Sequence, residues 1–409
     1  MRDMPDAGDQ GGDPLFDAPV VEHRNEIFKN RDLVDTDHVP DADRIIGRDE
    51  QIEQVAHEIG ALVVGEPASS VLIFGKTGTG KSLVAKHVMG RVEAEADRRG
   101  VSVGTAYINC SQTDGPARVP RNIGRRINPP ESGVKFPSRG ISTDEYYERL
   151  WSILNQHYDG VAITLDEVDR LRDDSPLMIL SRARENGSID IPISIVAISN
   201  KIDYRNQMNE RTKSSFGHRE YVFDPYDANQ LREILRNRSD AFHEGVIEEG
   251  VIPRVAALAA KEHGDARKGI ELLFSLGKYA IRNGYDTISE EDVPKVREMA
   301  EAERLRDLIT GLPAHSQHVI GALAALTISN SDEGWFRTSK VLDAYKKLCN
   351  EHAVDPVTHE RVRQLLEELS FLEITESRNQ HQGSKGQFNE HTLNKPPEII
   401  KQIYRETAP

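Results

Sequence analysis

The 409-residue chain has few cysteines and no long apolar segment. Its two cysteines, Cys110 and Cys349, lie far apart and have no Cys or His neighbours at metal-ligand spacing, so neither a disulfide framework nor a zinc site is expected. We interpret both as small, buried apolar residues. No run of about eighteen apolar residues is present, and the amino-terminal segment lacks the basic and then apolar layout of a secretion signal. These absences favour a soluble cytoplasmic protein with no membrane partner.

The net charge of −15 at pH 7 argues against simple electrostatic attraction to nucleic acid. This charge is unevenly distributed, because the first 50 residues hold 14 Asp or Glu against 6 Lys or Arg. Residues 1–20 also contain several Gly and Pro, which predicts a disordered acidic tail. Arginine outnumbers lysine while acids stay abundant, as suits a surface adapted to concentrated salt. Since salt weakens phosphate contacts, any DNA binding must rely on base or shape readout.

The glycine-rich segment 75–82 carries the strongest chemical signal. The apolar run 71–74 precedes it and the helix-compatible run 83–89 follows it, which is the setting of a phosphate-binding loop. Glycines let consecutive backbone N–H groups turn toward one anion, while Lys81 reaches the outer phosphates and Ser82 joins a magnesium shell. The alternative is a plain glycine-rich turn. The expected nucleotide contacts are Gly75, Lys76, Thr77, Gly78, Thr79, Gly80, Lys81, Ser82 and Leu83.

Carboxylates follow a second apolar run, 161–165. The carboxyl ends of parallel strands face the ligand crevice, so Asp166 is expected to hold magnesium and Glu167 to orient and deprotonate the attacking water. A polar turn is the alternative for this pair. Asp169 is expected to cap the next helix.

Two more polar residues are candidates for the same site. Asn200 follows the apolar run 193–198 and could bind the γ-phosphate or the lytic water, or simply start a turn. Arg267 falls on the apolar stripe of a helix that continues through Ile270, Leu273, Phe274, Gly277 and Ile281. An inward arginine needs a counter-anion, either a bound phosphate or a glutamate.

In this order, the phosphate loop, the Asp-Glu strand end, the Asn-ended strand and the segment 264–267 (Gly-Asp-Ala-Arg) resemble an AAA+ ATPase with Walker A, Walker B, sensor 1 and sensor 2. The local sequences at 109–114, 224–226, 231–238, 241–242 and 264–268 are similar to the archaeal origin-recognition and cell-division-control initiator family. The resemblance covers about residues 24–395.

This resemblance implies an α/β fold: an AAA+ core with a parallel sheet, a helical lid and a C-terminal winged helix. The expected boundaries are 21–225 for the core, with an initiator-specific insertion near 115–130, then 226–305 for the lid and 306–409 for the winged helix. It also implies ATP or ADP with Mg²⁺, binding of double-stranded origin DNA, recruitment or loading of the minichromosome maintenance helicase, contacts with other initiator paralogues, and a nucleoid-associated location.

The resemblance also assigns residues. Glu167, Asn200 and Arg267 act in slow ATP hydrolysis, and Arg211 lies near the expected position of a neighbouring subunit's arginine finger, although Ser215 stands where the related eukaryotic pattern has Arg. Gly47 similarly stands where relatives carry His. The expected contacts of the nucleoside are Ile45, Ile46, Tyr226 and Arg238.

Residues 118–127 have a helical split into an apolar and a basic side. Val119, Ile123 and Ile127 fall on one side, and Gly124 and Pro120 weaken the helix. In the family this insertion grips DNA, whereas an exposed basic face is otherwise often only solvated. The expected DNA contacts here are Arg118, Arg121 and Arg125.

The carboxyl-terminal region reads as a winged helix. A helix from Thr358 to about Leu369 is followed by a strand at 371–375, a polar tip at 378–386 and a returning strand near 387–393. The helix would enter the major groove and the tip the minor groove, unless the domain docks a protein instead. The expected DNA contacts are Arg361, Arg363 and Gln364 in the helix, and Arg378 and Lys385 in the wing.

Three functions remain open. The first is an ATP-dependent replication initiator, and the second is a nucleotide-gated DNA-binding regulator or specialised paralogue that loads no helicase. The third is a clamp-loader-like AAA+ subunit, which the winged helix and the arginine-rich insertion disfavour.

Overall fold

The computed structural model describes residues 26–112, 115–330, 332–381 and 387–407. The chain divides into two units, residues 1–293 and 294–409. Helix α12 (Asp292–Thr310) begins at the end of the first unit and continues into the second. The predicted acidic tail (1–20) and the candidate wing residue Lys385 lie outside the described residues.

A parallel sheet lies at the centre of the first unit. Its strands are β1 (Ser70–Gly75), β2 (Val103–Asn109), β3 (Gly160–Asp166), β4 (Ile193–Ser199) and β5 (His218–Phe223), in the order β2-β3-β4-β1-β5. All pairs are parallel. The apolar runs at 71–74, 161–165 and 193–198 form β1, β3 and β4, because strands covered on both faces are almost continuously apolar.

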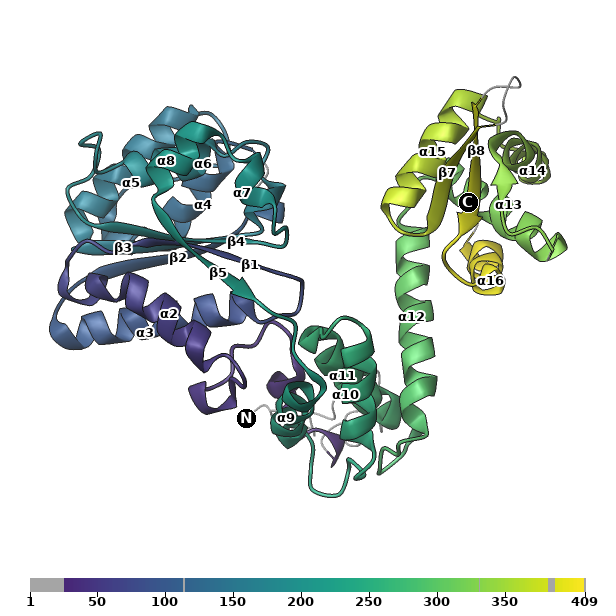
Figure 1. Cartoon of the computed structure of the whole chain (residues 1–409), viewed down its shortest axis with the longest axis horizontal. Helices are drawn as coiled ribbons and strands as arrows, with labels where there is room; N and C mark the ends of the chain where they lie inside the picture. Colours follow the sequence, from purple (N-terminus) through teal and green to yellow (C-terminus); the bar gives the residue numbers. More distant parts are fainter. Residues whose placement is uncertain (1–25, 113–114, 331, 382–386, 408–409) are drawn as a thin grey trace, which may run out of the picture. The chain divides into compact units, whose positions relative to one another are not determined.

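Helices cover both faces of the sheet (Figure 1). On one face lie α2 (Asp49–Ile59) and α3 (Lys81–Arg99), and on the other lie α4 (Arg118–Ile127), α5 (Thr143–His157) and α6 (Ser175–Arg182). The short helices α7 (Tyr204–Gln207) and α8 (Glu210–Phe216) precede β5. Single turns of 3-10 helix occur at Arg31–Val34, Ala42–Arg44, Gly60–Val64, Cys110–Gln112, Pro130–Ser132, Val168–Arg170 and Ser239–Ala241.

A helical lid completes the first unit. It contains α9 (Ala228–Arg238), α10 (Val251–Lys261) and α11 (Ala266–Asn283). Gly277 of α11 is required by close packing, since a Cβ there would lie 2.2 Å from the Phe28 ring. The amino-terminal segment around Phe28 is therefore part of the lid core.

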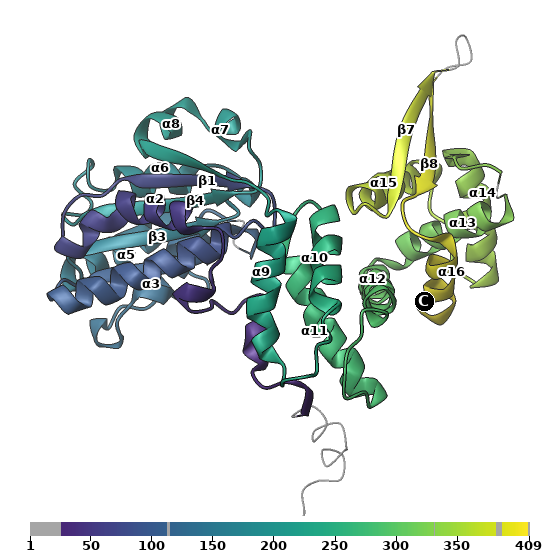
Figure 2. The ribbon, with the colours of Figure 1, turned by 60° about the horizontal axis from the view of Figure 1, so that its bottom comes forward.

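The second unit is a winged helix (Figure 2). After α12 come α13 (Ala314–Ser329), β6 (Phe336–Arg337), α14 (Thr338–Glu351), α15 (His359–Phe371), β7 (Thr375–His381), β8 (Gln387–Leu393) and α16 (Pro397–Thr407). The strands form an antiparallel sheet in the order β6-β8-β7. The predicted fold class is confirmed, and both cysteines are buried as expected.

The predicted first wing strand was misplaced. Residues 371–374 form the end of α15 and a turn, in which Glu373 has φ 56° and the Ile374 N–H donates to the Leu369 carbonyl at 3.1 Å. The apolar run was compatible with either structure, and the helix end satisfies its own last carbonyls in this way. The strand instead begins at Thr375, so Arg378 lies within β7 and not in the polar tip.

Candidate functional site

A cavity of about 710 Å³ opens at the carboxyl ends of the parallel strands, where the glycine-rich loop follows β1 and meets the lid. Its wall contains most of the residues that the sequence nominates: Ile45, Ile46, Thr77, Gly78, Thr79, Gly80, Lys81, Ser82, Leu83, Asp166, Glu167, Asn200, Tyr226, Arg238 and Arg267. Gly75, Lys76 and Arg211 are not part of this wall.

The loop backbone has the shape of an anion cradle. Gly78 and Gly80 have φ values of 75° and 83°, which side chains other than glycine rarely adopt. A Cβ on Gly78 would lie 1.7 Å from Asp265 Oδ1, and one on Gly80 would lie 2.5 Å from Tyr226 Oη. Only glycine therefore lets this backbone bend while neighbouring side chains approach it.

Lys81 lies at the floor of the cavity. Its Nζ donates to the carbonyls of Gly75 at 2.8 Å and Lys76 at 2.7 Å. Burial lowers the pKa of Lys81 to about 8, and the charge of Asp166 opposes this shift while that of Arg267 adds to it. A buried ammonium beside another cation favours a bound anion, so these residues fit a polyphosphate.

Ser82 and Asp166 are in direct contact at the cavity wall. The Ser82 hydroxyl donates to Asp166 Oδ2 at 2.5 Å, and the Glu167 N–H donates to Asp166 Oδ1 at 2.8 Å. Hydroxyl and carboxylate oxygens are the ligands that Mg²⁺ prefers, so the pair fits a magnesium site. Glu167 has φ 56°, a left-handed conformation that costs about 1–2 kcal/mol, and its strain coincides with the predicted catalytic position.

Tyr107 on β2 is a site residue that the sequence reasoning missed. Its hydroxyl donates to the same Asp166 oxygen as Ser82, and Lys86 Nζ lies 4.7 Å from its ring centroid. Burial, and then the charge of Asp166, raises the pKa of Tyr107, so the phenol stays protonated as a donor. The neighbouring strand β3 brings Asp166 beside it, a contact that only the sheet order reveals.

Asp169 does not cap the next helix, contrary to prediction. Its Oδ1 accepts hydrogen bonds from Ser199 Oγ at 3.1 Å and from the Asn200 N–H at 3.2 Å. The N-cap of α6 is Asp174 instead. Asp169 therefore joins the end of β3 to the end of β4 and fixes Asn200 at the cavity wall.

Arg48 was also missed. Its Nε donates to the Thr79 carbonyl at 2.9 Å and its Nη2 to the Asp224 carbonyl at 2.6 Å. The guanidinium carbon lies 3.9 Å from the centroid of the Tyr226 ring. This arginine therefore joins the glycine-rich loop, at Thr79, to the segment that contains Asp224 and Tyr226. No local pattern indicates it, because its partners are distant carbonyls and an aromatic face.

Arg267 is exposed, whereas the sequence placed it on the buried stripe. It lines the open cavity at the start of α11, where Asp265 caps the helix by accepting from the Arg267 N–H at 2.9 Å. The alternative for Arg267 was an ion pair with a glutamate, but the nearby glutamate Glu262 pairs with Lys268 instead, whose Nζ lies 2.7 Å from its carboxylate. The neighbouring N–H of Ala266 donates to the Gly78 carbonyl at 3.2 Å, so the lid touches the loop directly.

The far end of the cavity combines apolar and polar side chains. Ile45 and Tyr226 are buried there, and Arg238 Nη1 donates to the Leu33 carbonyl at 2.8 Å. Residues 36–39 also line this end, which the sequence gave no reason to expect. Arg211 lies exposed on α8, away from the cavity of its own chain.

Comparisons with known proteins agree with this geometry. Family models match an AAA domain at residues 65–201, a Cdc6 AAA+ ATPase-type lid domain at 232–298 and a CDC6 C-terminal winged helix domain at 307–403. A further family model, described as a protein of unknown function (DUF815), matches residues 18–108. The ORC1-type DNA replication protein 17 of the halophilic archaeon Haloarcula marismortui is 54% identical over 91% of this chain and 93% of its own length. The ORC1-type protein 9 of the same organism is 52% identical over 98% and 97%.

The chain belongs to the ORC1/Cdc6-type DNA replication initiator family. Among solved structures, the Aeropyrum pernix ORC1 protein in complex with DNA superposes with a TM-score of 0.81 at 33% identity, covering 93% of this chain and 97% of that one. The Aeropyrum pernix ORC2 protein, solved as ADPNP-ADP complexes, is similar in fold, with a TM-score of 0.58 at 19% identity over 93% of this chain and 98% of that one.

The predicted basic helix at 118–127 forms as α4. Val119, Ile123 and Ile127 are buried as expected. Gly124 is needed because a Cβ there would lie 2.1 Å from the Phe136 ring, which seats the following loop. That loop is held by Arg121, which donates to the Ser138 carbonyl at 3.2 Å, and by Arg125, which donates to the Phe136 carbonyl at 2.9 Å and to Ser138 Oγ at 3.1 Å. Arg118 is exposed at the start of the helix.

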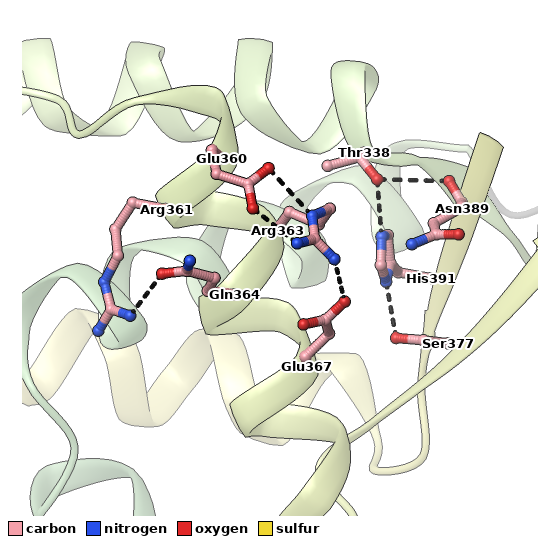
Figure 3. A network of polar contacts seen from close by, with 9 residues as sticks. All are labelled: Thr338, Glu360, Arg361, Arg363, Gln364, Glu367, Ser377, Asn389 and His391. Atoms are coloured by element: carbon pink, nitrogen blue, oxygen red, sulfur yellow. Dashed lines mark hydrogen bonds and ion pairs between the residues drawn. The ribbon is translucent and has the colours of Figure 1, made fainter. Parts of the chain in front are cut away.

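The predicted recognition helix forms as α15. Thr358 caps it by accepting from the Arg361 N–H at 3.3 Å, and Val362, Leu365, Leu366 and Leu369 are buried. Arg361, Arg363 and Gln364 lie on the outer side of the helix (Figure 3). No helix in the described part of the chain is long and apolar enough to cross a membrane.

Proposed function

We propose that this chain binds ATP with magnesium in the cavity, binds duplex origin DNA through α4 and the winged helix, and helps to recruit or load the minichromosome maintenance helicase. The family membership supports the initiator role, and the DNA complex of the Aeropyrum pernix ORC1 protein supports duplex binding. Hydrolysis of ATP to ADP and phosphate would be slow and would act as a switch.

The observation that carries the switch is the contact between the glycine-rich loop and the lid. The Ala266 N–H bonds to the Gly78 carbonyl, and Asp265 lies so close to Gly78 that no Cβ could fit between them. A phosphate chain on the loop would therefore act on the first turn of α11 directly. The lid leads through α12 into the second unit, so the chain is continuous from the nucleotide to the winged helix.

The wall residues have distinct parts in this mechanism. Lys81 would neutralise the outer phosphates, and Ser82 with Asp166 would hold the magnesium ion, which polarises those phosphates when bound. Asn200 would position a water molecule. Glu167, whose backbone is left-handed, would accept the proton of that water as it attacks. Arg267 would contact the γ-phosphate from the lid side, as a reporter of which nucleotide is present.

A comparison of ATP and ADP tests this proposal. Wild-type protein should bind duplex DNA and should capture purified minichromosome maintenance helicase differently with ATP and with ADP. Asp265→Ala removes the carboxylate that lies on the loop and should abolish that difference while ATP still binds. Asp286→Ala, an exposed lid substitution, serves as the matched control. Equal capture by wild type with either nucleotide would refute the switch.

A second candidate is a specialised paralogue that binds DNA without loading a helicase. It is favoured by the relatives themselves, since Haloarcula marismortui has ORC1-type proteins numbered 9, 13 and 17. A paralogue with this role would bind DNA with the same dependence on ATP and ADP but would not capture the helicase.

A further inference from the structure

Arg121 and Arg125 of α4 donate to neutral oxygens, whereas Arg361 and Arg363 of α15 pair with carboxylates. In α4, four arginines and no acid give residues 118–127 a net charge of +4. Within the described part of the chain, Arg121 and Arg125 donate only to neutral oxygens, namely backbone carbonyls, the Ser138 hydroxyl and the Asn122 side-chain amide. Hydrogen bonds to these neutral acceptors leave the positive charges of Arg121 and Arg125 without a compensating acid among the described residues.

In α15, two carboxylates hold Arg363 (Figure 3), and Glu368 holds Arg361. Arg363 donates from Nη2 to Glu360 Oε1 at 2.6 Å and from Nε to Glu360 Oε2 at 3.1 Å, and its Nη1 bonds to Glu367. Arg361 Nη1 lies 3.0 Å from Glu368 Oε1 and 3.1 Å from Gln364 Oε1. Two arginines and three glutamates give residues 359–371 a net charge of −1 with His359 neutral.

The wing repeats this arrangement. Arg378 on β7 donates from Nε and Nη2 to Glu390 Oε2 on β8, at 3.0 and 2.8 Å, and its guanidinium lies 4.1 Å from the centroid of the Trp335 ring. Each predicted arginine contact of the winged helix within the described residues is thus compensated by an acid. A surface of this kind has little long-range attraction for phosphates.

We propose that Glu360 and Glu367 are specificity-determining residues, which make α15 a reader of base edges with weak affinity for phosphates, while α4 supplies the sequence-independent affinity. This inference rests on the proposed binding of duplex DNA. In a groove, the two carboxylates lose water and approach phosphates, which is unfavourable on every sequence. Only base edges that donate to the carboxylates, or that accept from the remaining Arg363 donors, offset that penalty.

The test uses the full-length protein and duplexes randomised over about 20 base pairs, roughly two helical turns. Wild type selects a preferred duplex from this library. The dissociation constants for that duplex and for a shuffled duplex of the same composition are then measured across a series of salt concentrations. The variant is Glu360→Gln/Glu367→Gln. The matched control, Glu351→Gln/Glu398→Gln, removes two exposed carboxylates of the same unit that lie off α15.

The variant should bind the shuffled duplex about tenfold more tightly than the control does. On the preferred duplex the loss of base-edge contacts offsets this gain, so the ratio of the two dissociation constants falls by a similar factor. Its plot of log affinity against log salt should steepen by about 0.9 for each phosphate contact that a released arginine gains. Arg118→Gln should have the opposite signature, with a slope flatter by about 0.9 and an unchanged ratio.

Equal ratios and slopes for the variant and the control would overturn the inference and leave the proposed function intact. Failure of wild type to bind any duplex at every salt concentration would overturn the proposed function, and this inference with it. Binding of wild type with no sequence enrichment would overturn the inference alone.

Discussion

His391 should make the winged helix sensitive to mild acid. This residue on β8 has no exposed surface, and its two ring nitrogens lie 2.9 Å from Thr338 Oγ1 and 2.8 Å from Ser377 Oγ (Figure 3). A neutral imidazole, with one donor and one acceptor, is satisfied by these hydroxyls. Burial lowers the pKa of His391 from 6.5 to about 4, against the opposing charge of Glu390.

The sign of the effect follows from proton linkage. Between pH 6.5 and pH 4 the unfolded chain binds a proton at His391 that the folded chain does not, so stability falls as the pH is lowered. For these two pKa values the loss between pH 7 and pH 5 is about 2 kcal/mol. The loss is complete below the folded-state pKa.

Trp335 can report this unit selectively. The chain has two tryptophans, and Trp151→Phe leaves Trp335 as the fluorophore of the winged helix. The free energy of unfolding is measured in urea at fixed salt, at pH 7 and at pH 5. Its decrease between these two pH values should be about 2 kcal/mol larger with His391 present than in a His391→Gln variant of the same background. The variant itself should be less stable at pH 7. Identical pH dependence in the two proteins would refute the reasoning, because all other titrating groups are common to both.

Three further substitutions address the nucleotide cavity. Lys81→Ala should abolish ATP binding in a titration with a fluorescent analogue, and retained affinity would contradict the assignment of the loop. Glu167→Gln should bind ATP normally but lower phosphate release at least about a hundredfold, as expected for loss of a general base. Tyr107→Phe should raise the magnesium concentration needed for half-maximal ATP binding by about tenfold, because a partner of a metal ligand is lost. Binding of ADP without magnesium should be unaffected by this last change, and an equal loss there would indicate misfolding.

The sequence alone determined much of the candidate nucleotide site. Gly78, Gly80, Lys81 and Ser82 are contiguous, and the loop conformation depends on glycines at fixed offsets between a strand and a helix. Asp166 could be placed by one further rule, since the carboxyl ends of parallel strands share an edge. The buried stripes of α4 and α15 followed from helical periodicity in the same way.

The misplaced elements have a common cause. For residues 371–374 and for Asp169, the neighbouring sequence predicts one structure, but hydrogen bonds to other parts of the chain determine another. An apolar run fits a strand or the last turn of a helix equally well, and hydrogen bonds at the helix end decided the outcome. Asp169 could have capped a helix, but β4 brought the Asn200 N–H within its reach.

Local chemistry, then, is determined by the sequence: the anion loop, the strand-end carboxylates, and the Glu360–Arg363–Glu367 spacings at i,i+3 and i,i+4 that allow ion pairs on one helix face. Only the tertiary structure decided that Tyr107 binds Asp166 and that Arg48 binds the glycine-rich loop at Thr79. The physical reason is that these contacts join segments far apart in the chain, and their energies depend on burial and distance. Neither quantity exists until the sheet and the lid have assembled.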